Sequence, residues 1–397
     1  MEKIPENEIH DRIARFQSIL SKKDMDGALL MQNVDIYYFS GTLQTSILFI
    51  PREGKPIFMS LKNEERARAE SPIQNIISLK GRGKVAETLK DYGHEQFHKL
   101  GIEMDVLPAN IYLWLNRHLK ADLWENISGE ILRLRMIKSD YEIEQFRKAS
   151  QILRTGFLEI QEFIRPGMTE LAVDGRLANI ARREGHMGIL RMRGWNQEIT
   201  YAHVLSGESG AVPTFLDSPH GGSGNTPAMA QGAGFRKIKK NEPIGIDFGV
   251  AVNGYIGDQF RTYVAGSLSK KLEKAHDCSK AILKILSKKA KPGTNCLDLF
   301  AIARKKAEQE GLGEYFMGHG KSQARFVGHG IGLEIDEYPV ISPGFDMTLK
   351  ENMVMAIEPK FVFPGEGVVG LEDDYIVTAS GLKRITLTDQ KIMTVAN

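Results

Sequence analysis

The chain has 397 residues, which corresponds to two or three domains of ordinary size and excludes a small disulfide-stapled scaffold. Its 52 lysines and arginines nearly balance 50 aspartates and glutamates, so a net charge of +2 gives no field that would attract nucleic acid or an anionic membrane. Two cysteines, Cys278 and Cys296, are too few for a disulfide framework or a thiolate zinc site. The N-terminus is charged and no long apolar run occurs, so we expect a cytoplasmic protein.

Residues 1–125 alternate between helical and strand-like patterns. Apolar residues recur at helical spacing before residue 21, and apolar runs typical of strands follow at 27–31 and 45–50. A further helix is expected over 107–119, with Pro108 tolerated in its first turn. This alternation predicts an α/β domain.

The pattern changes near residues 125–138, where we place a domain boundary. Residues 132–138 resemble an incoming strand, and a helix cap with acidic residues follows directly. We therefore divide the chain into an N-terminal domain at 1–130 and a second domain at 131–397.

A pair of helices occurs twice in the second domain. A long amphipathic helix is predicted at 140–163 and another at 271–289. Each is followed by a Pro-Gly turn, Arg165-Pro-Gly167 or Lys291-Pro-Gly293, that opens a second helix. The repeat predicts a pseudo-twofold domain with a crevice between its halves, where ligand sites commonly form. The alternative is two unrelated Pro-Gly helix entries.

Residues 206–235 form a long segment between the repeats. The segment is rich in glycine, serine and proline and has no periodicity. Long loops inside a compact domain are usually either functional or disordered. Because this one directly precedes a charged strand, we expect it to form the lip of a site.

Two strand-like runs, 243–252 and 255–264, flank the dipeptide Asn253-Gly254, which is the strongest short-range hairpin signal. In a hairpin with a two-residue turn, the numbers of paired residues add up to 507. Asp258 would then face Gly249.

Asp247 and Asp258 would therefore point to the same side of this hairpin as a diagonal pair, with Cβ atoms roughly 7 Å apart. Two carboxylates on one buried face repel each other and are costly to desolvate, so a cation is expected between them. Arg261 and a divalent metal are the candidates, and solvated acids at a sheet edge are the alternative.

Three more candidate ligands occur in the C-terminal third. Glycines on both sides of His329 leave its imidazole accessible, although a lone histidine is more often structural. Glu358 and Glu372 each adjoin an apolar strand-like run, and either alone could be a plain surface acid. With a four-residue loop Glu358 would face Asp373. The two glutamates converge only if the loop has an odd number of residues or Pro359 creates a bulge.

These acidic and imidazole side chains together form an oxygen-rich ligand set. The five candidates are Asp247, Asp258, His329, Glu358 and Glu372. Such a set suits two divalent ions about 3.5–4 Å apart better than a lone tetrahedral zinc ion. Because two neighbouring divalent metal ions activate a bound water molecule and polarise a carbonyl group, hydrolysis of an amide is the reaction that such a site favours.

Several motifs resemble, in the same order, those of the pita-bread metallopeptidases (family M24), in particular the Xaa-Pro dipeptidase, aminopeptidase P and creatinase branch. The motifs are Ile246-Asp-Phe-Gly249, Gly254–Thr262, Gly328–Gly332, Ile357-Glu-Pro359 and Leu371-Glu-Asp373. The resemblance extends over residues 1–125, which are similar to the N-terminal domain of that branch. It implies an α+β protein, with an α/β N-terminal domain and a pita-bread catalytic domain that contains the pseudo-twofold repeat.

The resemblance also implies the chemistry of the site. The five candidates would hold two divalent ions, Mn²⁺ foremost with Co²⁺, Fe²⁺ or Zn²⁺ as alternatives, and Glu358 would also be the general base. The branch commonly forms dimers, so a homodimer is expected.

The chain departs from the family at positions that contact the substrate. Ala230, Arg325 and Asp336 stand where the family or this branch usually has histidines, and Gly370 replaces an arginine. Loss of one group that stabilises the tetrahedral intermediate can cost about 10²-fold in rate. Possible substitutes are His203, His220 and His319, although each of them is more simply explained as a plain loop histidine.

Arg325 and Asp336 could themselves bind substrate. The arginine would pair with a substrate carboxylate and the aspartate with an amine. The alternative is that the two residues form an internal salt bridge.

The leading hypothesis is a dinuclear metallohydrolase that cleaves short peptides, most like the Xaa-Pro enzymes. A hydrolase or lyase that acts on a small non-peptide amide or amidine is the second hypothesis. A non-catalytic binding module is the third, and the five intact ligands argue against it. The expected partner is a small peptide or other small molecule, with neither nucleic acid nor membrane.

Overall fold

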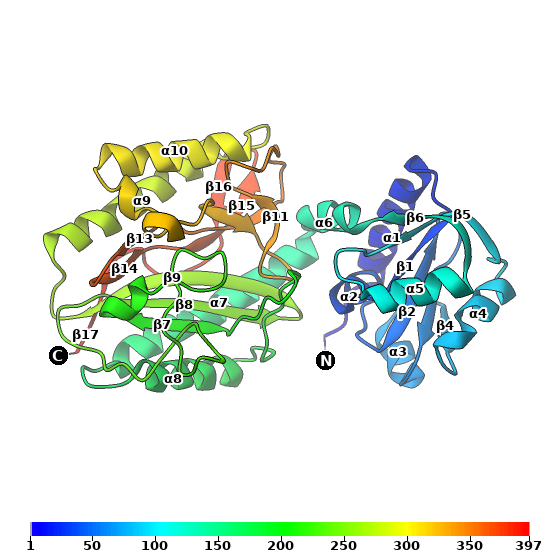
Figure 1. The fold of residues 1–397 in the computed structure, drawn as a ribbon, viewed down its shortest axis with the longest axis horizontal. Helices are drawn as coiled ribbons and strands as arrows, with labels where there is room; N and C mark the ends of the chain where they lie inside the picture. Colours follow the sequence, from blue (N-terminus) through cyan, green and yellow to red (C-terminus); the bar gives the residue numbers. More distant parts are fainter. Residues whose placement is uncertain (1, 397) are drawn as a thin grey trace. The chain divides into compact units, whose positions relative to one another are not determined.

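The computed structural model describes residues 2–396. The chain forms two compact units, of which the first ends at Arg135 and the second begins at Met136 (Figure 1). Within residues 2–396, no helix is long and apolar enough to cross a membrane.

The first unit contains a six-stranded mixed sheet in the order β4-β3-β2-β1-β5-β6. Strand β1 pairs antiparallel with β2 and parallel with β5. The strands are β1 (Gly27–Leu30), β2 (Ser46–Pro51), β3 (Ile57–Ser60), β4 (Asn75–Ser78), β5 (Gln96–Ile102) and β6 (Lys120–Asn126). The helices are α1 (Glu6–Lys22), α2 (Asn33–Ser40), α3 (Glu64–Glu70), α4 (Val85–Asp91), α5 (Ala109–His118) and α6 (Ser128–Met136).

Two sequence predictions can be compared directly with the helices of this unit. The helix expected over 107–119 is confirmed as α5, and Pro108 is its N-cap. The strand predicted at 132–138 is wrong, because these residues continue helix α6 as far as Met136. Ile131 and Leu134 are buried at helical spacing, and this burial outweighs the alternation that resembled a strand.

In the second unit, two pairs of helices cover the outer sides of a layer of strands (Figure 1). The first pair is α7 (Asp140–Phe163) and α8 (Glu170–Arg183), and the second pair is α9 (Lys270–Lys289) and α10 (Cys296–Gln309). The predicted long helices are confirmed, and Ser139 and Glu142 form a capping box at the start of α7. Gly167 and Gly293 both have φ +90°, so the turn before α8 and the turn before α10 require glycine in the same way.

The strands of the second unit form three sheets. Their orders are β17-β9-β8-β7, β11-β10-β12-β15-β16 and β13-β14. The first sheet contains β7 (Ala202–Ser206), β8 (Ile244–Val252), β9 (Tyr255–Ala265) and β17 (Met393–Val395). The other strands are β10 (Gly328–Gly330), β11 (Glu337–Val340), β12 (Val354–Ile357), β13 (Lys360–Phe363), β14 (Gly367–Gly370), β15 (Asp373–Thr378) and β16 (Gly381–Arg384).

Four short 3₁₀ helices complete the elements: η1 (Arg82–Lys84), η2 (Gly207–Ala211), η3 (Gly313–Tyr315) and η4 (Gly320–Ser322). After η2 no helix or strand occurs before Ile244, so the long loop predicted between the repeats is present.

The register of two strand pairs determines which acids share a face. In the β8–β9 hairpin Gly249 pairs with Asp258, as the Asn-Gly turn predicts. In the second pair Ile357 lies opposite Asp373 and Lys360 opposite Gly370, so the register is unchanged across Pro359 and no bulge occurs there. Three residues connect β13 to β14, and this odd-numbered loop brings Glu358 opposite Glu372.

Candidate metal centre

The five candidate ligands come together in the second unit. Strands β8 and β9 carry Asp247 and Asp258, β10 carries His329, and Glu358 and Glu372 lie in the short breaks after β12 and before β15. All five line one cavity. Four of them are buried, and Asp247 is partly buried.

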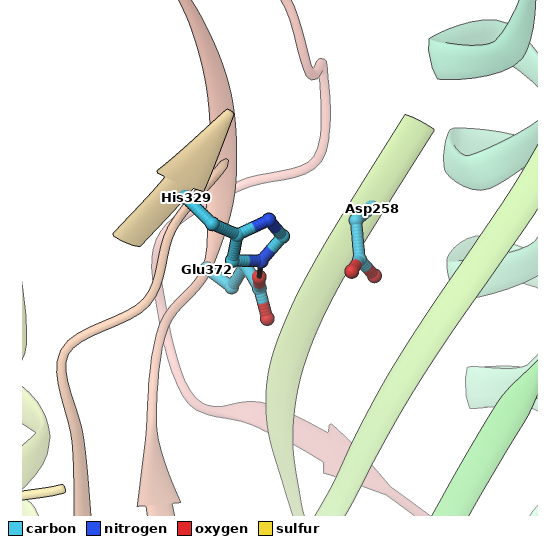
Figure 2. Close-up of side chains that lie close together, drawn as sticks. All are labelled: Asp258, His329 and Glu372. Atoms are coloured by element: carbon cyan, nitrogen blue, oxygen red, sulfur yellow. Dashed lines mark ion pairs between the residues drawn. The ribbon is translucent and has the colours of Figure 1, made fainter. Parts of the chain in front are cut away.

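Asp258, His329 and Glu372 are close enough to hold one metal ion. Each offers a ligand atom, and these atoms lie within 4.8 Å of one another. Figure 2 shows His329 and Glu372 projecting toward Asp258 from the opposite side of the site. Glu358 Oε1 lies 3.7 Å from His329 Nε2, so a third carboxylate oxygen lies close to this group. One imidazole and several carboxylate oxygens form a donor set that suits a divalent transition metal.

The electrostatics of these acids favour a bound cation. Burial, and then the negative charge of Asp247, raises the pKa of Asp258 well above its usual value. Burial also raises the pKa of Glu372, and the charges of Glu358 and Asp258 add to this effect. A divalent ion bound between Asp258 and Glu372 would stabilise their ionised forms.

A lysine that the sequence analysis missed also belongs to this cluster. Lys360 is 1% exposed, and its Nζ lies 2.9 Å from Asp247 Oδ2, 2.7 Å from Glu358 Oε2 and 2.6 Å from Glu372 Oε2. Burial disfavours the ammonium, but these carboxylates outweigh burial and raise the pKa of Lys360 well above its usual value. The same ammonium, together with His220, holds the pKa of Asp247 below its usual range in spite of burial.

Two histidines lie next to Asp247. His220 Nε2 donates a hydrogen bond of 2.8 Å to Asp247 Oδ2, and His203 is the cross-strand neighbour of Asp247 on β7. The two imidazole rings lie edge to face with centroids 5.9 Å apart, and both side chains line the cavity. Burial and the neighbouring His220 lower the pKa of His203 to about 4, so its imidazole is neutral at pH 7.

Comparison with known proteins identifies the family. Residues 144–379, more than half of the chain, match the model of metallopeptidase family M24, and residues 12–137 match the creatinase/prolidase N-terminal domain. The chain belongs to family M24. It is therefore a metallopeptidase, and the expected α+β architecture with a pita-bread catalytic domain is confirmed by the solved structures that it resembles.

The similarity to individual M24 proteins extends over their whole length. An Xaa-Pro dipeptidase of Pyrococcus furiosus is 27% identical over 385 residues, which cover 96% of this chain and 99% of the relative. The structure of an Xaa-Pro dipeptidase from Bacillus anthracis superposes with a TM-score of 0.83 at 28% identity and covers 98% of this chain and 100% of that one. The prolidase of Pyrococcus horikoshii OT3 gives a TM-score of 0.81 at 26% identity, covering 96% and 99%.

The side chain of Arg261 does not lie between Asp247 and Asp258. The hypothesis that Arg261 neutralises the charges of these two aspartates is therefore wrong. Its guanidinium is fully buried and donates to Asp373 Oδ1 at 2.6 Å and to the main-chain carbonyl of Glu372 at 2.8 Å. The side chain of Arg261 alternates with that of Phe260 along β9, so it points away from the face that carries Asp258 and Asp247. Lys360 supplies the cation instead.

The structure separates the four residues that were proposed to contact substrate. His220 and Asp336 line the same cavity as the five candidate ligands, and the carboxylate of Asp336 lies 3.4 Å from His329 Nδ1. Arg325 is exposed and does not line the cavity, because its neighbour Ala324 takes the buried position in this segment. His319 lines a separate hollow that shares only residues 216–218 with the cavity.

Apart from the candidate ligands and the two histidines, the cavity lining is largely apolar with two acidic groups. Its apolar lining includes Leu190, Met192, Ile199, Leu216, Phe326 and Ile335. Asp217 and Asp336 add two carboxylates, and burial together with the charge of Glu358 raises the pKa of Asp217. Within the described chain, no arginine or lysine lines this cavity.

Proposed function

We propose that the protein uses a bound divalent metal to hydrolyse a peptide bond in short peptides with a free N-terminus, Xaa-Pro peptides foremost. The observation that carries this proposal is the buried group Asp258, His329 and Glu372 inside the M24 match. The relatives named Xaa-Pro dipeptidase support the substrate class, because they align over nearly the whole of both chains. Mn²⁺ is the proposed ion, with Co²⁺, Fe²⁺ and Zn²⁺ as alternatives.

Each residue of the site has a proposed role. When bound, the metal supplies a Lewis acid that polarises the scissile carbonyl and lowers the pKa of the attacking water. Asp258, His329 and Glu372 hold it. Glu358 is the proposed general base: its Oε2 is fixed by Lys360, while its Oε1 faces the His329 side of the site and is available for the proton. This proton then passes to the leaving nitrogen.

His203 is the proposed donor that stabilises charge on the substrate oxygen, and His220, whose Nε2–H is used by Asp247, lies beside it. Both line the cavity next to Asp247, and His203 Nε2 is buried without a hydrogen-bond partner in the protein. A buried ring nitrogen without a partner is costly unless a ligand satisfies it. A substrate carbonyl would accept this hydrogen bond.

The acidic lining supports recognition of the N-terminal amine. Asp336 and Asp217 would attract an ammonium group, and the apolar walls would receive the side chain of the first residue. The same two acids also favour a second candidate function, hydrolysis of a small cationic amidine.

We further propose that residues 131–397 form the catalytic domain of a cytoplasmic homodimer that engages neither nucleic acid nor membrane. The near-neutral charge and the two free buried cysteines support this setting. Light scattering of the purified chain tests the dimer.

A peptide panel tests the proposed reaction. Xaa-Pro dipeptides and tripeptides are compared with N-acetylated versions and with Xaa-Ala peptides, after the metal-free protein is supplied with Mn²⁺ or Co²⁺. We expect turnover of the free Xaa-Pro peptides and at least a tenfold loss on N-acetylation. Absence of turnover on every peptide, together with hydrolysis of an amidine, would replace the first function by the second.

A further inference from the structure

The ammonium group of Lys360 lies among three carboxylates of the metal centre, in a position where a cation is expected. The ammonium group has three N–H donors, and each carboxylate around it accepts one: Asp247 at 2.9 Å, Glu358 at 2.7 Å and Glu372 at 2.6 Å. Because the side chain is 1% exposed, these carboxylates rather than water fix the position of Nζ.

The two glutamates divide their oxygens between Lys360 and a second position. Oε2 of Glu358 and Oε2 of Glu372 contact the ammonium. Their Oε1 atoms lie 3.7 Å and 3.9 Å from His329 Nε2. Asp258 completes this second position, which is the one that suits a metal. The centre therefore has two adjacent cation positions with shared carboxylates, which is the arrangement of a two-metal site, but a lysine already fills one of them.

The neighbouring strand is built to leave room for this lysine. Lys360 pairs with Gly370 across β13 and β14. A Cβ on Gly370 would lie 2.8 Å from Lys360 Cα, 3.0 Å from Lys360 Cγ and 2.7 Å from the Pro359 carbonyl oxygen, so a larger residue would force the lysine to move. Gly370 stands where the related branch has an arginine, so at this pair of positions the basic side chain comes from the opposite strand.

A second divalent ion does not fit beside the ammonium. A metal ion needs the same oxygens of Asp247, Glu358 and Glu372 that Lys360 occupies, at shorter metal–oxygen distances of about 2.0–2.2 Å. It would also lie in contact with a like charge in a buried site, where such repulsion is poorly screened.

We propose that Lys360 is a built-in cation that replaces the second metal, so that the protein binds one divalent ion, at Asp258, His329 and Glu372. This inference rests on the proposed metal site and changes its stoichiometry. The five-ligand, two-metal arrangement expected from the sequence thereby becomes a one-metal arrangement, in which Asp247 pairs with Lys360 and His220.

The number of bound ions tests the proposal without any measurement of turnover. Metal-free wild type, Lys360→Ala and Lys138→Ala are loaded with Mn²⁺, desalted and analysed by elemental mass spectrometry. Lys138 is a matched control because it is equally buried and pairs at 3.1 Å with Glu337, which is not one of the five candidate ligands. We expect one equivalent in wild type and in Lys138→Ala. We expect two in Lys360→Ala, since that substitution frees three carboxylate oxygens.

Electron paramagnetic resonance of Mn²⁺-loaded wild type gives a second readout that needs no variant. A six-line spectrum of an isolated ion is expected. A spin-coupled pair, any wild-type count other than one, or a Lys360→Ala count that stays at one would overturn the proposal. A two-metal protein that cleaves peptides would refute this inference alone, whereas a one-metal protein without activity would refute only the proposed function.

Discussion

Removal of the Arg261 side chain should strongly destabilise the second unit. The guanidinium is fully buried, and all five of its N–H donors are used. They bind Asp373 Oδ1 and the main-chain carbonyls of Phe260, Glu372, Thr388 and Asp389, at 2.6–2.8 Å. In Arg261→Met, Asp373 keeps its bonds from Gln259, Thr386 and Gln390 but loses its buried counter-charge.

Breaking a buried ion pair in this way costs about 3–5 kcal/mol. For a unit of this size, each kcal/mol corresponds to roughly 2–4 °C in melting temperature, so a decrease of about 6–20 °C is expected. Scanning calorimetry at pH 7 measures it. The control is Arg304→Met, whose pair with Glu308 is 56% and 53% exposed and should change the free energy of unfolding by less than about 1 kcal/mol. If Arg261→Met were no less stable than this control, the reasoning would be refuted.

Three further substitutions test the site and the pH dependence. Glu358→Ala should lower kcat by at least about 10²-fold, and near-normal turnover would exclude Glu358 as the base. His203→Ala should lower kcat by about 10²-fold with a smaller change in KM, and a change confined to KM would contradict a role in stabilising the transition state. Burial raises the pKa of Asp174 from 3.8 to about 6, so the folded state loses stability as pH rises through this interval. Asp174→Asn should therefore increase the free energy of unfolding by up to about 3 kcal/mol at pH 8 and by little below pH 4, and urea unfolding that shows the same increase at both values would contradict this.

The local sequence predicts much of the fold that positions the site. Asn253-Gly254 fixes the register of β8 and β9, so the shared face of Asp247 and Asp258 follows from pleating alone. The requirement that two glutamates converge predicts either an odd-numbered loop or a bulge at Pro359, and the structure has the odd-numbered loop between β13 and β14. Such short-range rules succeed because turn geometry and strand alternation depend on neighbouring residues.

Contacts that depend on tertiary structure were harder to predict. Lys360 follows Glu358 by two positions and so shares its face, which is a signal in the sequence, but its contact with Asp247 requires the packing of two separate hairpins. His220 precedes Asp247 by 27 residues rather than the 17 that the family leads one to expect. The long loop folds back and brings this histidine to the site, and no local pattern shows such a return.

The dependence of peptide hydrolysis on metal equivalents tests the account most directly. Metal-free protein is titrated with Mn²⁺ at protein concentrations well above the dissociation constant, and the initial rate on an Xaa-Pro dipeptide is followed. The account predicts no activity without metal and a linear rise that stops at one equivalent. Hydrolysis by the metal-free protein, or a rise that continues to two equivalents, would contradict it.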